Sequence, residues 1–391
     1  MKISILLPYK ENFSPEYPGA VSIFINSVTK LSKYKNIITI FGNTKFKKKY
    51  NLKYRNISLD KKFLSSQSND YVKKFSLLEK NEPSDIIEIH NRPIYIKLLE
   101  TLNTNLVLYF HNDPLSMNGS KKKSERLSLL NRCSRIIFNS EWSKKRFLKN
   151  LEKFYEKSSK LQVIHQSIDR EKVNINKKEK LITFVGKLNA AKGYDLFANA
   201  IVKILDKHKQ WKSIVVGDEA RENISAVHKN LKNLGFLNHN KVLGIYKRSS
   251  IAVVCSRWEE PFGRTSLEAA SRGCAVIISN RGGLPETITN GVIIRNLNSK
   301  NVFKSIDNLI QKDKFRKRLQ NFSIKNFYLT NKYISSRIDN YRSEISTQKK
   351  ITNSHLGDKK LKILHVTNFN ERHNGRLFYN TGRRINNGFI R

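Results

Sequence analysis

The chain has 391 residues, 39% of them hydrophobic, and it carries 74 Lys and Arg residues against 32 Asp and Glu, a formal net charge of +42. This length and apolar content exclude a largely disordered chain and predict two domains of ordinary size. The positive charge indicates a polyanionic partner such as nucleic acid, anionic lipid or a phosphorylated substrate, although compositional drift explains it equally well.

Short apolar strands alternate with longer amphipathic stretches along the chain. Several strands are apolar throughout, as strands buried on both faces of a parallel sheet are. The alternation predicts an α/β fold with two Rossmann-like parallel sheets, each with helices on both faces. The predicted strands are Ile3–Leu7, Ile37–Phe41, Ile86–Ile89, Leu106–Phe110, Arg135–Phe138, Leu161–Ile164, Leu181–Val185, Lys212–Val216, Ile251–Cys255, Cys274–Ile278 and Val292–Ile294.

A polar, charged segment, "DREKVNINKKEK" (residues 169–180), separates the two groups of strands and is predicted to be a linker. The first domain then spans residues 1–168 and the second residues 181–325. The stretch Asp313–Ile345 has a helical pattern, and we expect its later part, residues 326–345, to cross back to the first domain.

Residues 346–391 begin with a second charged segment and are expected to lie outside both domains. Within them, "LKILHVTNFNERHNGRLF" (residues 361–378) resembles the N-terminal "MKISILLPYKENFSPEYPGAVSIF" in its strand, polar loop, glycine and helix start. The segment is either the truncated start of a further α/β domain or a docked accessory strand, since a short internal match is weak evidence.

The segment "EEPFGRTSLEAASRGCAVI" (Glu259–Ile277) combines an anion-binding loop with two acids. The loop joins a predicted strand to a short helix at the carboxyl edge of the sheet, where open α/β sheets bind ligands. The N–H groups of Gly263, Arg264 and Thr265 would attract an anion there. Glu260 and Glu268 flank the loop, and a carboxylate binds neutral hydroxyl groups well.

These features predict a ligand that has a diphosphate between two sugars, as a nucleotide sugar has. The alternative is an ordinary βαβ unit in which Glu260 lies on the surface and Glu268 lies in the first turns of a helix. The complete string, E-P-F-G with a second Glu eight residues on and a helix of small residues, favours the ligand site.

The string Glu260-x7-Glu268, followed by "GGLPE" (Gly282–Glu286), resembles the retaining family-4 glycosyltransferases of the GT-B fold, of the bacterial group 1 type. The resemblance covers about residues 1–345 and implies two Rossmann-like domains that face each other across a cleft. Three further segments agree with the family in order: "VLYFHNDPLSM" (Val107–Met117), "IIFNSEWSKKRFL" (Ile136–Leu148) and "VGKLNAAKGYDLFANAI" (Val185–Ile201).

The resemblance implies roles for the matching residues around the sugar and the nucleoside. Glu268 would hold the ribose hydroxyls of the donor, and Glu260 would contact hydroxyls of the donor sugar. His111 would lie near the anomeric carbon. Gly19, in "YPGAV", would belong to an N-terminal loop that closes over the donor phosphate; the family has paired glycines there, and Ala20 replaces the second one.

The resemblance also implies which residues bind the diphosphate. Lys187 stands where the family usually has Arg, so a planar, bidentate phosphate contact is lost at that position. The residues expected to bind or neutralise the phosphates are Lys187, Lys192, Phe262, Gly263, Arg264 and Thr265.

The chain has no D-x-D motif, so a bridging divalent metal has no obvious pair of carboxylates. The resemblance likewise implies a hexosyltransferase that needs neither a metal nor another cofactor. It implies retention by attack on the same face of the sugar, since no nucleophile for a double displacement can be nominated. His111, Glu260 and Lys192 are the expected catalytic residues, and His111 is expected to orient and polarise and not to act as a general base.

Three other aromatic residues are weaker candidates. His90 ends a predicted strand in "IIEIHNRP" and is a second candidate for contact with the donor or the acceptor. Trp142 and Trp258 could stack on sugar rings, but as bulky residues beside strands they are expected to belong to the core.

The segment "KKRFLKNLEKFYEKSSK" (Lys144–Lys160) places apolar residues at helical spacing among cations. This is typical of a helix that binds an anionic membrane surface, although packing of an ordinary core-facing helix explains it slightly better. A glycan or lipid-linked acceptor in polysaccharide or lipopolysaccharide synthesis, bound at the inner face of the cytoplasmic membrane, is the expectation at the level of the family.

The cysteines and the N-terminus favour a cytoplasmic protein. Cys133, Cys255 and Cys274 are far apart and predict buried, reduced thiols without a metal site. The N-terminal apolar run is too short for a signal peptide, and no run approaches the ~18 apolar residues of a spanning helix. Any contact with a membrane is therefore expected to be peripheral.

Two other classes of function stay open. A nucleic-acid-binding protein would explain the charge but leaves the two acids and the phosphate loop unexplained, and the sequence has no zinc-finger or RNP-type motif. We therefore expect no nucleic-acid partner. A catalytically weak GT-B scaffold is compatible with Lys187 and Ala20, and a phosphorylase or epimerase of the same fold is the nearest alternative enzyme.

Overall fold

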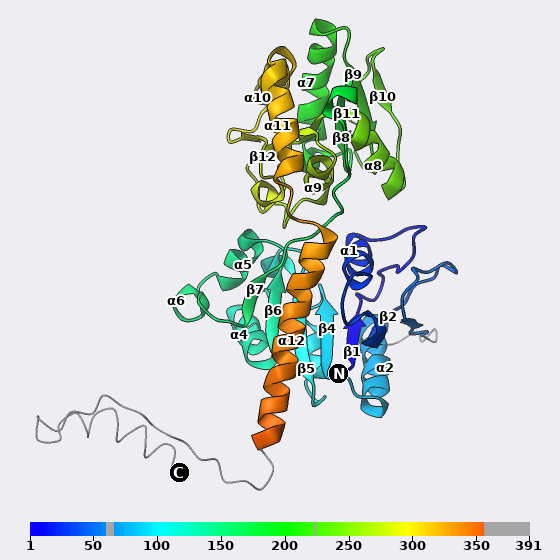
Figure 1. Cartoon of the computed structure of the whole chain (residues 1–391), viewed down its shortest axis with the longest axis vertical. Coiled ribbons are helices and arrows are strands. Elements are labelled where there is room, and N and C mark those ends of the chain that lie inside the picture. Colours follow the sequence, from blue (N-terminus) through cyan, green and yellow to red (C-terminus); the bar gives the residue numbers. More distant parts are fainter. Residues whose placement is uncertain (60–65, 223, 356–391) are drawn as a thin grey trace, which may run out of the picture. The chain divides into compact units, whose positions relative to one another are not determined.

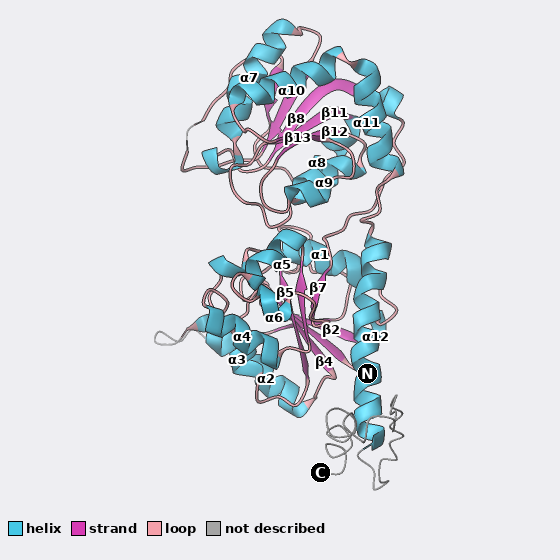
Figure 2. Cartoon of the chain, turned by 90° about the vertical axis from the view of Figure 1, so that its left-hand side faces the viewer, coloured by secondary structure: helices cyan, strands magenta, loops and turns pink. Residues whose placement is uncertain are grey.

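The computed structural model describes residues 1–59, 66–222 and 224–355. These residues form two separate parallel sheets, each accompanied by helices (Figure 1, Figure 2). The prediction of an α/β fold with two Rossmann-like sheets is thus confirmed. The segment 361–378, which resembles the N-terminus, lies outside the described residues.

The first sheet has seven strands among the described residues, in the order β3-β2-β1-β4-β5-β6-β7, and all of its pairs are parallel. The register pairs His90 with Tyr109, so the carboxyl ends of β4 and β5 lie side by side. The strands are β1 (Ile3–Leu6), β2 (Ile38–Gly42), β3 (Tyr54–Asn56), β4 (Ile86–His90), β5 (Asn105–Phe110), β6 (Arg135–Phe138) and β7 (Leu161–Val163).

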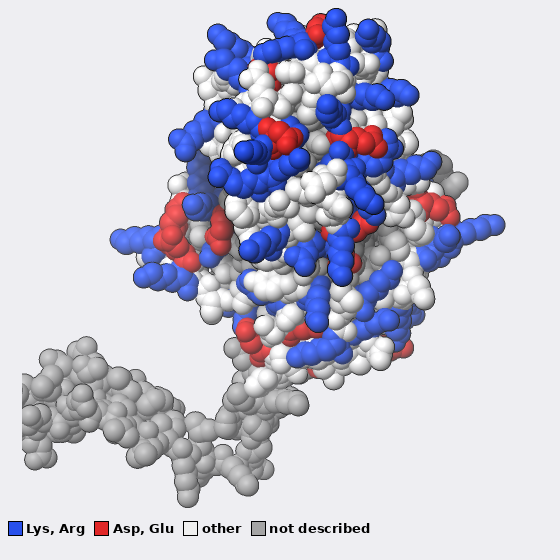
Figure 3. Space-filling model, turned by 45° about the horizontal axis from the view of Figure 1, so that its top comes forward, with Lys and Arg blue, Asp and Glu red and all other residues white. Residues whose placement is uncertain are grey.

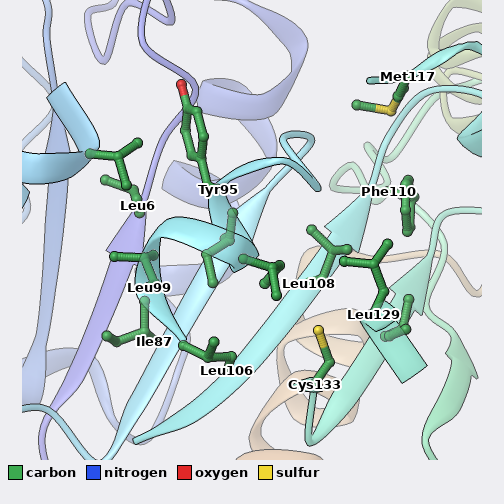
Figure 4. Close-up of a cluster of buried hydrophobic side chains, with 14 of the residues drawn as sticks. Leu6, Ile87, Tyr95, Leu99, Leu106, Leu108, Phe110, Met117, Leu129 and Cys133 are labelled. Carbon is green, nitrogen blue, oxygen red and sulfur yellow. The ribbon is translucent and has the colours of Figure 1, made fainter. Parts of the chain in front are cut away.

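Both faces of the central strands of the first sheet are buried, which explains why these strands are mainly apolar. Alternate strand residues on one face pack against helices, as Figure 4 shows for Leu6, Ile87 and Leu108 beside Tyr95 and Leu129. The other face lies against α1 and the first half of α12. The helices between or after these strands are α1 (Ala20–Thr29), α2 (Gln67–Asn81), α3 (Tyr95–Leu99), α4 (Lys123–Arg132), α5 (Glu141–Leu148), α6 (Glu152–Tyr155) and α12 (Asn331–His355).

The second sheet has six parallel strands in the described part of the chain, in the order β10-β9-β8-β11-β12-β13. Its core joins these strands to α7 and α10. The strands are β8 (Glu179–Val185), β9 (Lys212–Val216), β10 (Leu231–Asn233), β11 (Ser249–Val254), β12 (Ala275–Ser279) and β13 (Val292–Ile294), and the helices are α7 (Tyr194–Lys207), α8 (His239–Arg248), α9 (Arg264–Ser271), α10 (Ser299–Gln311) and α11 (Asp313–Lys325).

The prediction of one helical stretch over Asp313–Ile345 is wrong, because residues 326–330 separate α11 from α12. Phe327 and Leu329 are buried within this break, and the Leu329 carbonyl accepts a hydrogen bond from the Ile168 amide at 3.1 Å. In a continuous helix the Leu329 carbonyl would accept a hydrogen bond within the helix. Its bond from Ile168 therefore favours an extended chain at residues 326–330.

The segment Lys144–Lys160 is not one basic helix either. It contains the end of α5 and the four-residue α6, and Asn150 between them has a positive φ of 64°. Phe147, Leu148 and Leu151 are buried in the core of the first sheet, whereas Phe154 is 75% exposed. Packing of an ordinary core-facing helix therefore accounts for most of the apolar pattern.

The thiols of Cys133, Cys255 and Cys274 are buried and form no disulfide. Burial raises the pKa of Cys133 and of Cys255 to about 12. Among the residues described, no helix combines the length and the apolar character needed to cross a bilayer.

Candidate functional site

A cavity of about 250 Å³ lies at the carboxyl ends of β8, β11 and β5. Its wall includes seven residues that the sequence predicted as site residues: His111, Lys192, Glu260, Phe262, Gly263, Arg264 and Thr265. Thr265 is the second residue of α9. The structure therefore gathers, from distant segments, most of the residues nominated for one site.

Lys192 and Glu260 pair with each other inside this cavity. The Lys192 Nζ atom donates to Glu260 Oε1 at 2.5 Å, and the Glu260 side chain is 12% exposed. Lys192 ends the short 3-10 helix Ala190–Lys192, which Asn189 caps by accepting from the Lys192 amide at 2.9 Å. The loop after β8 thus places the Lys192 ammonium group beside the Glu260 carboxylate in the loop after β11.

The N-terminus of α9 also faces the cavity. Gly263 is its N-cap residue, with a positive φ of 110°, and no side chain caps the helix there. A β-carbon at Gly263 would lie 2.3 Å from Leu284 Cδ2, so both the backbone conformation and the space require glycine. The first N–H groups of α9 remain available for an anion.

Arg264 belongs to the walls of two pockets. Besides the first cavity, it lines a pocket of about 440 Å³ together with His239 and Arg272. The Arg264 Nε atom lies 2.8 Å from Glu268 Oε1, and Nη1 is buried without a hydrogen-bond partner among the described residues. One buried guanidinium nitrogen is therefore left for a ligand.

Glu268 is buried beside the second pocket and does not line the first. Its Oε1 atom contacts His239 Nε2 at 2.8 Å as well as Arg264. Burial alone would raise the pKa of Glu268, but these two partners outweigh it and hold the pKa below its ordinary value. Both contacts use Oε1, so Oε2 is the oxygen left for a hydroxyl group.

His111 follows β5 and enters the cavity from the first sheet. It is 7% exposed, and burial lowers its pKa to about 4. Its Nε2 atom lies 3.0 Å from Nδ1 of His90, and Nδ1 has no partner within the described chain. His111 is therefore a neutral imidazole at pH 7.

Two segments of the family resemblance meet behind the phosphate loop. The Ser140 hydroxyl donates to the Pro261 carbonyl at 2.5 Å, and Glu286 accepts hydrogen bonds from the amides of Glu141 and Trp142 at the N-terminus of α5. Gly283 fits tightly between these groups, since a β-carbon there would lie 2.5 Å from the Pro261 oxygen. These contacts hold the loop that carries Glu260.

Three residues that the sequence singled out do not line the first cavity: Lys187, Gly19 and Trp258. Lys187 follows β8 but is exposed and is not part of the wall of either pocket. Gly19 is the N-cap residue of α1, where the Ser22 amide donates to Glu11 Oε1 at 2.9 Å; only its neighbour Ala20 lines the cavity. Trp258 is 54% exposed, so its expected place in the core is wrong.

His239 and Glu286 were missed as supporting residues because they come from segments far along the chain from their partners. Nothing in the string "LNHNKV" marks His239 as the partner of Glu268, which lies 29 residues later. Glu286 lay within the recognised string "GGLPE", but only the fold reveals that it caps a helix of the first sheet.

The two sheets define the class of the protein. HepE of Anabaena, solved in complex with UDP-glucose, aligns with 88% of this chain and 100% of its own at a TM-score of 0.69 and 16% identity. WaaG, a glycosyltransferase involved in lipopolysaccharide biosynthesis, aligns with 86% of this chain and 99% of its own at a TM-score of 0.63 and 12% identity. The fold is therefore GT-B.

Sequence comparison agrees with the fold. Residues 165–326 match the model of the family "Glycosyl transferases group 1". Over 361 residues the chain is 23% identical to spore coat protein SA of Bacillus subtilis, and the alignment covers 83% of this chain and 93% of that protein. Together, the match and the fold support a group 1 glycosyltransferase of the GT-B fold.

Proposed function

We propose that the chain is a retaining hexosyltransferase of family 4, which moves a sugar from a nucleotide-sugar donor to a glycan or lipid-linked acceptor. One observation carries the proposal: Arg264 lines both pockets, with Glu260 in the wall of one and the His239–Glu268 pair beside the other. A donor has this same order of groups, a sugar, a diphosphate and a nucleoside.

In this arrangement the donor sugar occupies the cavity of Glu260, whose carboxylate accepts hydrogen bonds from its hydroxyls. The diphosphate lies against Arg264, Lys192 and the N-terminus of α9, where positive charge and free N–H groups meet. The ribose reaches Oε2 of Glu268. The UDP-glucose bound in HepE supports a donor of this class.

The reaction breaks the bond between the anomeric carbon and the terminal phosphate oxygen. Lys192, Arg264 and the α9 terminus stabilise the charge that develops on the departing diphosphate, an effect worth several kcal/mol in a preorganised site. The acceptor hydroxyl attacks from the same face, and its proton goes to an oxygen of the leaving phosphate. This scheme assigns no step to a metal ion.

His111 has a narrower part in the scheme. With a pKa of about 4 it is a weak base at neutral pH. We propose that it donates or accepts one hydrogen bond at the sugar and so orients the ring, and that it takes no proton from the acceptor.

We further propose that the acceptor belongs to a cell-surface polysaccharide or lipopolysaccharide and that the protein meets it in the cytoplasm, at the inner face of the membrane. Similarity in fold to WaaG supports this acceptor class. The excess of Lys and Arg suits an anionic lipid surface. Sedimentation with liposomes tests the surface contact, and binding that does not depend on anionic lipid content would contradict it.

A thermal-shift screen of UDP-, GDP- and ADP-linked sugars tests the donor assignment. At a hundredfold excess over Kd, a true donor should stabilise the wild type by about 2.7 kcal/mol. Glu268→Ala, compared with its own ligand-free form, should show only the smaller part of that stabilisation by the donor. Glu179→Ala is the matched control, because Glu179 pairs with Arg248 on the surface of the same sheet.

Equal stabilisation of wild type and Glu268→Ala by one donor would contradict the ribose role. Binding of a donor without transfer or hydrolysis of its sugar would favour a catalytically weak scaffold. Retention of nucleic acid in salt-dependent gel shifts, with no response to any donor, would favour the nucleic-acid alternative.

A further inference from the structure

His90 and His111 form a buried pair behind the cavity. His90 ends β4 and His111 follows β5, and the parallel register of these strands places them side by side. Nδ1 of His90 lies 3.0 Å from Nε2 of His111, and the rings are nearly parallel, at 22°. His90 is 2% exposed and is not among the residues that line the cavity.

The contact decides which nitrogen of His111 is left for a ligand. Burial keeps both imidazoles neutral, so each ring has one donor and one acceptor nitrogen, and the pair places a single proton between them. Nε2 of His111 is engaged by His90. Nδ1 of His111 is therefore the remaining ring nitrogen, and its protonation follows from the direction of the shared hydrogen bond.

His90 is itself held by ring packing. Its ring stacks on Tyr109 with centroids 4.3 Å apart, and the Tyr109 hydroxyl lies 2.5 Å from that of Tyr341. Tyr341 in turn bonds to Glu88, which receives two hydrogen bonds from Arg342 at 2.7 and 2.8 Å. This buried network reaches from β4 to α12 and supports Tyr109 beneath the His90 ring, whose Nε2 atom has no hydrogen-bond partner among the described residues.

The ring of His111 has fewer restraints of its own. Its backbone is held by Asn91 and Asn139, which bond to its amide at 3.1 Å and its carbonyl at 2.9 Å. Its ring is contacted by the edge of Phe24, with centroids 5.5 Å apart, and by Nε2–Nδ1 bonding to His90. Phe24 restricts the space, but His90 alone provides a directional contact to a ring nitrogen within the described residues.

We infer that His90 is a positioning residue, which through its Nδ1 atom fixes the ring orientation and the tautomer with which His111 meets the donor sugar. The inference rests on the proposed function for its consequence in catalysis, and on the His90–His111 geometry alone for the tautomer. His90 acts through His111 and makes no contact with the substrate.

Two substitutions separate positioning from packing. His90→Phe keeps an aromatic ring over Tyr109 but removes Nδ1, and we expect kcat to fall by about 10- to 100-fold, as when the orienting partner of a site histidine is lost. The KM for the donor should change by less than about twofold, since uniform binding is untouched. His90→Asn places an amide near the position of Nδ1 and should restore most of kcat.

His208→Phe is the control, because His208 at the end of α7 bonds to Asp307 of α10 at 2.7 Å, beside the second sheet and away from the pair. Its kcat should equal that of the wild type. Equal losses in His90→Phe and His90→Asn, or unchanged kcat in His90→Phe, would overturn the inference.

Nitrogen NMR of the ligand-free, full-length protein tests the pair without any turnover. With ¹⁵N-labelled histidine, and His111→Asn to assign the signals, His90→Phe should change the ring nitrogen shifts of His111 and His90→Asn should return them towards the wild type. Unchanged His111 shifts in His90→Phe would refute the positioning role. Absence of transfer by the wild type would instead refute the proposed function, while the NMR result still decides the tautomer.

Discussion

The four charged side chains of the candidate site are arranged in two compensating groups. Lys192 pairs with Glu260, and Arg264 shares the Glu268 carboxylate with His239. Each carboxylate therefore keeps a cation at contact distance in a largely buried position, which lowers the cost of burying either charge. A donor diphosphate brings two further negative charges. Lys192, Arg264 and the N-terminus of α9 can attract these charges while the two ion pairs stay formed.

Burial of a neutral His111 makes stability depend on pH. The ordinary pKa of histidine is about 6.5, and that of His111 in the folded protein is about 4. Between these values the unfolded chain binds more protons than the folded one, so the free energy of unfolding falls as the pH is lowered.

From pH 7 to pH 5 this one group should cost the wild type about 2 kcal/mol. His111→Asn cannot titrate and should lack that part of the loss. Urea unfolding of both proteins at pH 7, 6 and 5 measures the difference. Parallel curves of stability against pH for the two proteins would show that His111 is not buried as a neutral base.

At the scale of elements, α9 links the anion loop to the second sheet through Gly263. Gly263→Ala should destabilise the protein by more than about 2 kcal/mol, because alanine is strained at a positive φ and its β-carbon would meet Leu284. The same substitution should weaken donor binding, since Gly263 is part of the cavity wall.

Gly244 provides the matched control for this substitution. It lies inside α8, and a β-carbon there would meet nothing within 4 Å. Gly244→Ala should therefore stabilise the protein by about 0.5 to 1 kcal/mol. Urea unfolding of both variants checks the two opposite signs, and a neutral Gly263→Ala would contradict the strained conformation assigned to α9.

The predicted strands include all the central strands of both sheets. Arg135–Phe138, Lys212–Val216 and the edge strand Val292–Ile294 were predicted with their observed bounds, because each is a mainly apolar run. The short edge strands β3 ("YRN") and β10 ("LKN") were missed, because their residues are largely polar and are exposed or half-buried.

The candidate site was predictable where its residues are close in sequence. Glu260, Gly263 and Arg264 lie in one string, and the predicted strand, loop and helix start place all three at the carboxyl edge of the sheet. His239 beside Glu268 and His90 behind His111 depend on which strands and helices become neighbours, and no local pattern records that.

At the scale of the whole molecule, the positive charge is general and not confined to the site. Lys and Arg side chains cover much of the face shown in Figure 3, and Asp and Glu are fewer and scattered among them. Such a surface raises the local concentration of any anionic ligand and makes association rates sensitive to salt. The charge therefore cannot distinguish a nucleotide sugar from other polyanions, whereas Arg264 and its neighbours can.

After the second sheet, α12 returns the chain to the first sheet, and a buried ion pair attaches α12 to β4. Arg342 of α12 is 2% exposed and Glu88 of β4 is 1% exposed, and two hydrogen bonds join them. Tyr341 also bonds to Glu88, so the same contact supports the network beneath His90. Loss of Arg342 would leave an uncompensated carboxylate in the core, a defect that commonly costs about 3 to 5 kcal/mol.

Arg342→Met should therefore destabilise the first sheet by about 3 to 5 kcal/mol, whereas Glu88→Met combined with Arg342→Met should cost clearly less, because Glu88 is then not left as a buried charge and Asp339, which Arg342 also contacts, keeps its hydrogen bonds from Ser32 and Lys33. Trp142 fluorescence in a background with Trp211→Phe and Trp258→Phe follows unfolding of this sheet in urea. Arg132→Met is the control, since Arg132 pairs with Glu100 on the surface and should contribute under about 1 kcal/mol. If the double variant lost as much stability as the sum of its single variants, Glu88 and Arg342 would act independently, and their ion pair would not be what attaches α12 to β4.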